Sequence, residues 1–308
     1  MSRTAAWLRD RSVYVAFAIL ILIDLALTPG FQNPLVLRSL LFEAAPILLI
    51  TLGQSLAIGT RGINLSVDSV MGLASAAIGL TLGAGQTVAI LAALATGLAA
   101  GLLNGALVAV LGINPLISSL ALLVAARGLA QALTGGARLD LPGTGPLAAL
   151  GQTAPLGIPL AAILAIAIAL LFAGLVRATL FGRYAIFAGA SRTAAELAGI
   201  PVRRTLAAVY ALSGLLAGAA GILASARLGA ADPNYIGTGL ELDAIAAAVI
   251  GGTPLSGGRV NITGAVTGVL LLRVLDASFI MNDINSTYAQ MLKAAFIIAA
   301  LYLQRAGG

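Results

Sequence analysis

Apolar stretches long enough to cross a lipid bilayer recur along almost the whole chain of 308 residues. A helix needs about 20 predominantly apolar residues to span the hydrocarbon core. Hydrophobic residues make up 60% of the chain and charged residues only 9%, whereas soluble domains carry about 25% charged residues. The mean hydropathy of +1.04 agrees with this pattern. The chain is therefore predicted to be an all-α, polytopic integral membrane protein.

The apolar stretches predict about ten transmembrane helices. They cover residues 13–30, 40–59, 63–82, 87–111, 115–134, 158–176, 205–227, 240–252, 260–280 and 287–304. Two of them are interrupted by polar residues, because 63–82 opens with GINLSVDS and 240–252 holds two acids before a Gly-Gly pair. Either is expected to be a short, broken or re-entrant helix, a kind of segment that lines cavities in transporters.

A charged segment at about 177–204 divides the apolar stretches. It holds a single acid, Glu196, and the basic residues Arg177, Arg183, Arg192, Arg203 and Arg204. Short loops rich in Lys and Arg stay on the cytoplasmic side. The segment is therefore predicted to be a cytoplasmic loop within a single permease-like domain, 1–308.

This orientation assigns the remaining charges and the ends of the chain. An even number of crossings on either side of the loop predicts that both termini are cytoplasmic. Arg3, Arg9 and Arg11 precede the first apolar stretch as in a signal peptide, but no small-x-small cleavage site follows, so an uncleaved first span is expected. Further arginines are expected inside (Arg61, Arg259 and Arg305) and outside (Arg38, Arg138 and Arg227).

Composition excludes several classes of site. The chain has no cysteine and no histidine, which removes disulfides, Cys/His metal sites and the Ser-His-Asp triad. The net charge of +6 comes from residues spread along the chain, whereas nucleic-acid binding needs them clustered on one face. No long soluble tract is present, so any ATPase or binding domain must belong to another chain.

Glycines recur at a spacing of four residues in three predicted spans: Gly97, Gly101 and Gly105; Gly214 and Gly218; Gly264 and Gly268. Small residues at this spacing let helix backbones approach closely in lipid. Chance is an equal explanation for any one pair, because the chain holds 37 glycines.

Polar residues inside predicted spans are costly and suggest a pathway, a partner or a function. Asn64, Ser66 and Asp68 are evenly spaced around a predicted helix start. There they either bind a solute or cap the helix. Arg127, twelve residues past Pro115, lies about 18 Å along its predicted helix. It either reaches the outer interface, pairs internally or lines the pathway.

The segment 237–258, GTGLELDAIAAAVIGGTPLSGG, is the most distinctive in the chain. Glu241 and Asp243 are two residues apart and do not share a helix face, so they are poor candidates for paired acid and base catalysts. Acids are favoured in the first turn of a helix, which fits both of them. The glycines around Thr253–Ser256 predict a tight turn, and the Gly-Lys-Ser/Thr of a phosphate-binding loop is missing.

These segments resemble the membrane permeases of bacterial monosaccharide ABC importers of the ribose, xylose and galactose type. The resemblance runs from about residue 40 to 304 and rests on GINLSVDSVMGLAS (62–75), RGLAQALTGG (127–136), GRYAIFAGASRTAAELAGIPV (182–202) and ELDAIAAAVIGGTPLSGGR (241–259). ADPNYIGTGLELDAI (231–245) and SGGRVNITG (256–264) are most similar to the galactofuranose branch. Two positions depart from the family, which has Asp in place of Asn64 and Gly in place of Asp68.

The resemblance implies partners and site residues. ATP and Mg²⁺ would be bound by a separate ABC ATPase subunit, and sugar would arrive on a periplasmic binding protein. A second permease subunit, identical or paralogous, would complete the pathway in the lipid of the bacterial inner membrane. The residues that would couple to the ATPase are Ser191, Ala194, Ala195, Glu196, Leu197 and Gly199. The expected pathway, 54–72 with 237–256, includes Gln54, Asn64, Ser66, Asp68, Glu241, Asp243 and Thr253, with Asn104 and Arg127 as lesser candidates.

Three other functions remain open from the residues alone. An ABC permease for another solute, such as a branched-chain amino acid or a signalling molecule, would share this architecture. An ion-coupled secondary transporter would work without an ATPase, which the 182–202 segment argues against. An intramembrane enzyme would need a nucleophile and a base, and the chain offers no convincing pair.

Overall fold

The computed structural model describes residues 12–285, 287–288, 290–292, 294–295 and 298. Its α-helices are α2 (Ser12–Leu27), α3 (Pro34–Gly59), α4 (Val67–Thr81), α5 (Gln86–Ala109), α6 (Pro115–Thr134), α7 (Pro146–Gln152), α8 (Leu160–Ala178), α9 (Leu180–Ala190), α10 (Arg192–Leu197), α11 (Val202–Leu228), α12 (Leu240–Ile250) and α13 (Ile262–Met281). Two short 3₁₀ helices, η1 (Leu82–Ala84) and η2 (Pro155–Gly157), complete the helical elements. A two-residue strand pair joins β1 (Leu139–Asp140) to β2 (Ala230–Ala231).

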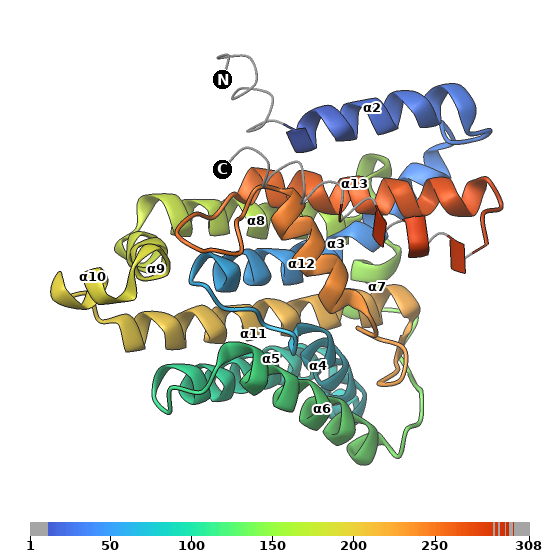
Figure 1. Cartoon of the computed structure of the whole chain (residues 1–308). Helices are drawn as coiled ribbons and strands as arrows, with labels where there is room; N and C mark the ends of the chain where they lie inside the picture. Colours follow the sequence, from blue (N-terminus) through green and yellow to red (C-terminus); the bar gives the residue numbers. More distant parts are fainter. Residues whose placement is uncertain (1–11, 286, 289, 293, 296–297, 299–308) are drawn as a thin grey trace, which may run out of the picture.

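The helical class and the multi-pass character are confirmed. Within the described residues, seven helices are long and apolar enough to cross a membrane: α3, α4 with η1, α5, α6, α8, α11 and α13. The apolar helix α2 is shorter and lies along α13 (Figure 1). Most of the predicted span 287–304 lies outside the described residues, as do Arg3, Arg9, Arg11 and Arg305.

Helix α11 is the centre of the bundle and packs against α3, α4, α5 and α7 (Figure 1). Glycine allows its approach to α5, because a Cβ placed on Gly97 would lie 2.4 Å from the carbonyl oxygen of Gly214. Helices α12 and α13 meet in the same way, since a Cβ on Gly268 would lie 2.3 Å from the carbonyl oxygen of Ala247. The close helix contacts expected from the glycine spacing are therefore present.

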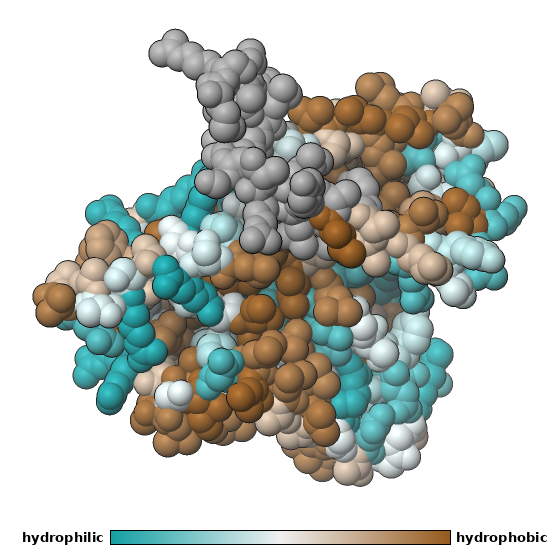
Figure 2. All heavy atoms as spheres, in the orientation of Figure 1, coloured by the Kyte–Doolittle hydropathy of each residue, from teal (hydrophilic) through white to brown (hydrophobic). Residues whose placement is uncertain are grey.

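Polar contacts gather at two opposite ends of the bundle. At the α10 end, the Arg61 guanidinium donates to the carbonyl oxygens of Ala190 and Ser256, both at 2.7 Å. At the β1–β2 end, Arg227 pairs with Glu43 at 2.7 Å and Arg138 with Asp140 at 3.1 Å. Figure 2 shows hydrophilic residues around α9 and α10 at the left and around the opposite end at the right, with hydrophobic residues between. The predicted division of these arginines between two ends is thus present.

Two crossings are interrupted. Helix α4 begins at Val67 after the non-helical residues 60–66, and α12 has only 11 residues. An 11-residue helix spans about 16 Å, roughly half of the hydrocarbon core. The non-helical segment before α12 reaches into the bundle, because a Cβ on Gly237 would lie 2.1 Å from the carbonyl oxygen of Asp68. The short helix predicted at 240–252 is therefore found, and it begins inside the bundle.

Candidate functional site

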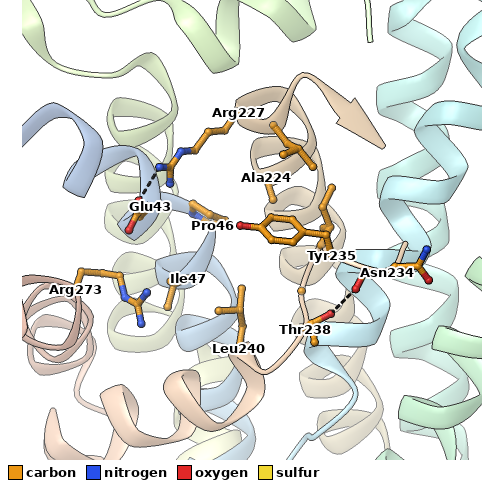
Figure 3. Close-up of a pocket in the computed structure, with 13 residues that line it drawn as sticks. Glu43, Pro46, Ile47, Ala224, Arg227, Asn234, Tyr235, Thr238, Leu240 and Arg273 are labelled. Carbon is orange, nitrogen blue, oxygen red and sulfur yellow. Dashed lines mark hydrogen bonds and ion pairs between the residues drawn. The ribbon is translucent and has the colours of Figure 1, made fainter. Parts of the chain in front are cut away.

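A cleft of about 650 Å³ lies at the β1–β2 end, above the start of α12 (Figure 3). Its walls come from the first half of α3, the last turn of α11, the 234–238 segment and the middle of α13. The cleft exists because the chain crosses this level as an irregular segment, which leaves space that a continuous helix would fill. Non-helical backbone at this depth is tolerated where it lines a cavity.

Charged groups and one aromatic ring line the cleft. Figure 3 shows the Tyr235 side chain extending across it toward Pro46, and this side chain is 70% exposed. Glu43 and Arg227 form their ion pair on one side (Figure 3). Arg273 lies on another, held by Asp243 and, at 2.6 Å, by Asp276. An aromatic face beside hydrogen-bond donors and acceptors suits a small polar solute that also has an apolar surface.

Arg127 holds the irregular wall of the cleft from behind. Its Nη1 donates to the carbonyl oxygens of Pro233 and Ile236, both at 2.8 Å, and its Nη2 lies 3.3 Å from Asp68 Oδ2. Of the roles left open for Arg127, internal pairing is the one observed. Asp68 is the partner of this arginine in the first turn of α4.

Gln131 and Asn234 add a second tie to the same segment. Gln131 Nε2 donates to Asn234 Oδ1 at 2.9 Å, and Asn234 Nδ2 donates to the carbonyl oxygen of Gly136 at 2.8 Å. Arg127 thus supplies partners for two carbonyl groups of a stretch of backbone outside helix and sheet, and the Gln131 bond ties a side chain of the same stretch to α6.

Asn64, Ser66 and Asn104 lie together in a buried polar network and not in the cleft. Asn64 Oδ1 accepts from the Ser66 hydroxyl at 2.7 Å and from Asn104 Nδ2 at 3.2 Å, while Asn64 Nδ2 donates to the Ser213 hydroxyl at 3.0 Å. Ser118 closes the network by donating to Asn104 Oδ1 at 2.8 Å. The network joins the start of α4 to α5, α6 and α11.

The remaining expected pathway residues lie in different surroundings. Thr253 is buried in the turn after α12, where its hydroxyl accepts from the backbone N–H of Asn261 at 3.2 Å. Gln54 is fully buried in α3, and neither polar atom of its amide has a hydrogen-bond partner. Glu241 lies close to Asp68 and Arg127, and its Oε2 also has no partner.

The sequence did not single out the cleft residues Tyr235, Arg227 and Arg273 as pathway candidates. Tyr235 does fall in the run ADPNYIGTGLELDAI (231–245), whose resemblance to the galactofuranose branch says nothing of what this side chain contacts. Its Asp-Pro-Asn start was a usable signal, because these residue types favour turns over helix. Within the described residues, no group of three acidic side chains is placed to hold a metal ion.

The α10 end presents a short exposed helix. The Ser191 hydroxyl accepts from the Ala194 N–H at 3.3 Å and caps α10, and Arg192 pairs with Glu196 at 3.3 Å. Ala195 is fully buried in a cluster with Ala109, Ala188, Val202 and Leu206. Leu197 is 86% exposed at the tip, and Gly199 follows with φ of +75°.

Comparison with known proteins places this architecture. The family described as "Branched-chain amino acid transport system / permease component" matches residues 36–301. The galactofuranose transporter permease protein of Escherichia coli (strain K12) is 36% identical over 98% of this chain and 91% of its own. The fructose import permease protein of Bifidobacterium longum (strain NCC 2705) is 38% identical, with coverages of 90% and 79%.

A third relative, the ribose import permease protein of Escherichia coli (strain K12), is 35% identical over 97% of this chain and 94% of its own. No solved structure matches the chain. The family match covers most of the chain, and the relatives exceed 30% identity over nearly all of it. The chain therefore belongs to this permease family and is a multi-pass transport subunit of a bacterial ABC importer.

Proposed function

We propose that this permease moves a monosaccharide inward across the bacterial inner membrane without changing it chemically. The observation that carries the proposal is the near full-length similarity to three permeases named for galactofuranose, fructose and ribose. The run ADPNYIGTGLELDAI (231–245) favours galactofuranose among them. Its residues form the irregular wall of the cleft and the start of α12.

In this proposal the β1–β2 end faces the periplasm and the α10 end faces the cytoplasm, as do both termini. The concentration of arginines between 177 and 204 supports this orientation. The cleft then receives sugar released by the periplasmic binding protein. Tyr235 offers the apolar face of the sugar a ring to pack against, and the charged groups beside it bind hydroxyls.

The α10 end is the proposed docking surface for the ATPase, which holds the ATP and Mg²⁺. A helix of six residues is marginal by itself, and α10 is fixed here through Ala195 while Leu197 remains exposed for a partner. A second permease subunit, a further copy or a paralogue, completes the pathway.

Reconstitution tests the proposal. The chain is purified gently with the ATPase, binding protein and permease that accompany it and is placed in proteoliposomes. Uptake of labelled galactofuranose, D-fructose, D-ribose and L-leucine is then measured with and without ATP. We expect uptake of one of the sugars that requires both ATP and the binding protein. Uptake of leucine alone would reassign the substrate, and uptake by this chain without ATP would contradict the importer mechanism.

A further inference from the structure

One face of α3 runs from the cleft into the interior of the bundle. Ile47, Thr51, Gln54 and Ile58 share this face, because residues three or four apart on a helix are neighbours. Ile47 lines the cleft, and Ile58 packs against Ala248 and Val249 of α12. Thr51 and Gln54 therefore lie one and two turns deeper than the cleft wall, on the face that turns toward α12.

The opposing face of α12 carries Glu241, Ile245 and Ala248 at the same helical spacing. Leu240 lines the cleft together with Ile47, while Ala248 meets Ile58. Helices α3 and α12 thus run side by side between the Ile47–Leu240 level and the Ile58–Ala248 contact. This places Thr51 and Gln54 opposite the first two turns of α12. Glu241 lies in the first of those turns.

These three residues share an unusual property. Thr51 Oγ1, both polar atoms of Gln54 and Glu241 Oε2 are buried and have no hydrogen-bond partner. Buried polar groups are nearly always paired, and each exception calls for an explanation. The first turn of α12 adds backbone N–H groups that a helix start leaves unpaired, and no side chain caps it.

We propose that Thr51, Gln54 and Glu241 form an inner polar station, where hydroxyl groups of the transported sugar bind after they leave the cleft. This inference rests on the proposed function and adds a second site to it, deeper in the bundle. The amide of Gln54 donates to one hydroxyl and accepts from another, while Thr51 and Glu241 complete the set. In the described arrangement Thr51 and Gln54 are fully buried, so the groups are poised for a ligand that is present only in transit.

The test separates a ligand-binding role from a structural one. Gln54→Met keeps the length of the side chain and removes the amide, and Thr51→Val keeps its shape and removes the hydroxyl. Ser55→Ala is the control, because the Ser55 hydroxyl is buried but already donates to the carbonyl oxygen of Thr51 at 2.8 Å. Sugar uptake by the complete importer and the Tm of the purified permease are measured for each variant.

We expect Q54M and T51V to lower uptake by roughly tenfold, the factor that corresponds to one lost hydrogen bond. Their Tm should be unchanged or higher, because a buried group without a partner has been removed. S55A should retain most of the uptake. Unchanged uptake in Q54M, or a Tm that falls together with uptake, would overturn the proposal.

A second measurement does not depend on knowing the sugar. The chain has no cysteine, so a single Gln54→Cys substitution gives one thiol to label with a small cationic methanethiosulfonate. We expect labelling during ATP turnover and little labelling at rest. Absence of labelling under both conditions would contradict the station. If the wild-type importer takes up none of the sugars, the proposed function fails, while labelling of Q54C would still show a solvent-reached inner station.

Discussion

Arg127 and Asp68 form an ion pair, with 3.3 Å between Nη2 and Oδ2, that joins α6 to the first turn of α4. The same guanidinium holds two backbone carbonyls of the segment that walls the cleft, so one side chain fixes three parts of the structure. Both side chains are largely buried, at 18% and 7% exposure. The loss of either partner is therefore felt both by the fold and by the cleft.

The two partners of this pair are predicted to differ in importance. Arg127→Gln leaves Asp68 beside Glu241 with no cation, so it should destabilise the permease by about 3–5 kcal/mol and lower Tm by several degrees. Asp68→Asn should be milder, because Arg127 keeps both carbonyls and lies close to Glu241. Thermal unfolding of the purified variants checks the order. An equal loss in both variants would refute this division of roles.

Gly214 is predicted to tolerate no side chain. A Cβ there would lie 2.3 Å from the carbonyl oxygen of Gly97, a backbone atom that has no freedom to turn away. Gly214→Ala should cost about 1–3 kcal/mol by forcing α5 and α11 apart. Gly128→Ala is the matched control, because no heavy atom lies within 4 Å of that Cβ position. It should gain about 0.5–1 kcal/mol from helix propensity, and Tm measurements distinguish the two signs.

Leu197 is predicted to act in assembly and not in folding. Leu197→Asp should leave the free energy of unfolding within about 0.5 kcal/mol of wild type, because the side chain is 86% exposed. Recovery of the ATPase in pull-downs and ATP-driven uptake should both fall at least about tenfold, since a charge replaces an apolar contact at the proposed interface. Glu196→Ala, which removes only an exposed ion pair, is the comparison and should change stability by a few tenths of a kcal/mol. Full ATPase recovery with L197D would place the docking surface elsewhere.

Tyr235 is predicted to contribute its ring to sugar capture. Tyr235→Ala should lower the rate of uptake at limiting sugar by roughly 3- to 10-fold, as expected for one aromatic contact of about 0.5–1.5 kcal/mol. Its Tm should stay close to wild type, because the side chain is 70% exposed. Tyr235→Phe retains the ring and should keep most of the uptake. Equal losses in both variants would assign the role to the hydroxyl instead.

Much of the helical framework could be predicted from local sequence. Asn33 and Asn114 each precede a proline, and each caps its helix through its side chain. Asn33 Oδ1 accepts from the backbone N–H of Leu35, and Asn114 Oδ1 accepts from that of Leu116, both at 2.9 Å. This signal places the start of α3 at Pro34, six residues before the apolar stretch that the sequence indicated at 40. Hydropathy marks the core of a span, whereas the capping residues mark its end.

The pairing of polar residues could not be predicted, because it depends on contacts between distant segments. Asn64 is 149 residues from Ser213 and 40 from Asn104, and no local period connects them. The residues alone left Asn64 as either a solute ligand or a cap, and the structure adds a network role that neither reading included. The position of Tyr235 in the cleft likewise follows from how the segment before α12 is held by α6, which is a tertiary feature.

Arg61 has a mechanical consequence. Its guanidinium bonds Ala190 at the end of α9 and Ser256 in the turn after α12, while its backbone follows the last turn of α3. A displacement of α9 and α10 would therefore act on α3 and on the turn after α12, both through Arg61 and through the close backbone approach of Gly189 to Gly59. Helices α3 and α12 are the two whose facing sides carry Gln54 and Glu241. A push on the short exposed helix at one end of the permease would thus change the distance between the two walls of its interior.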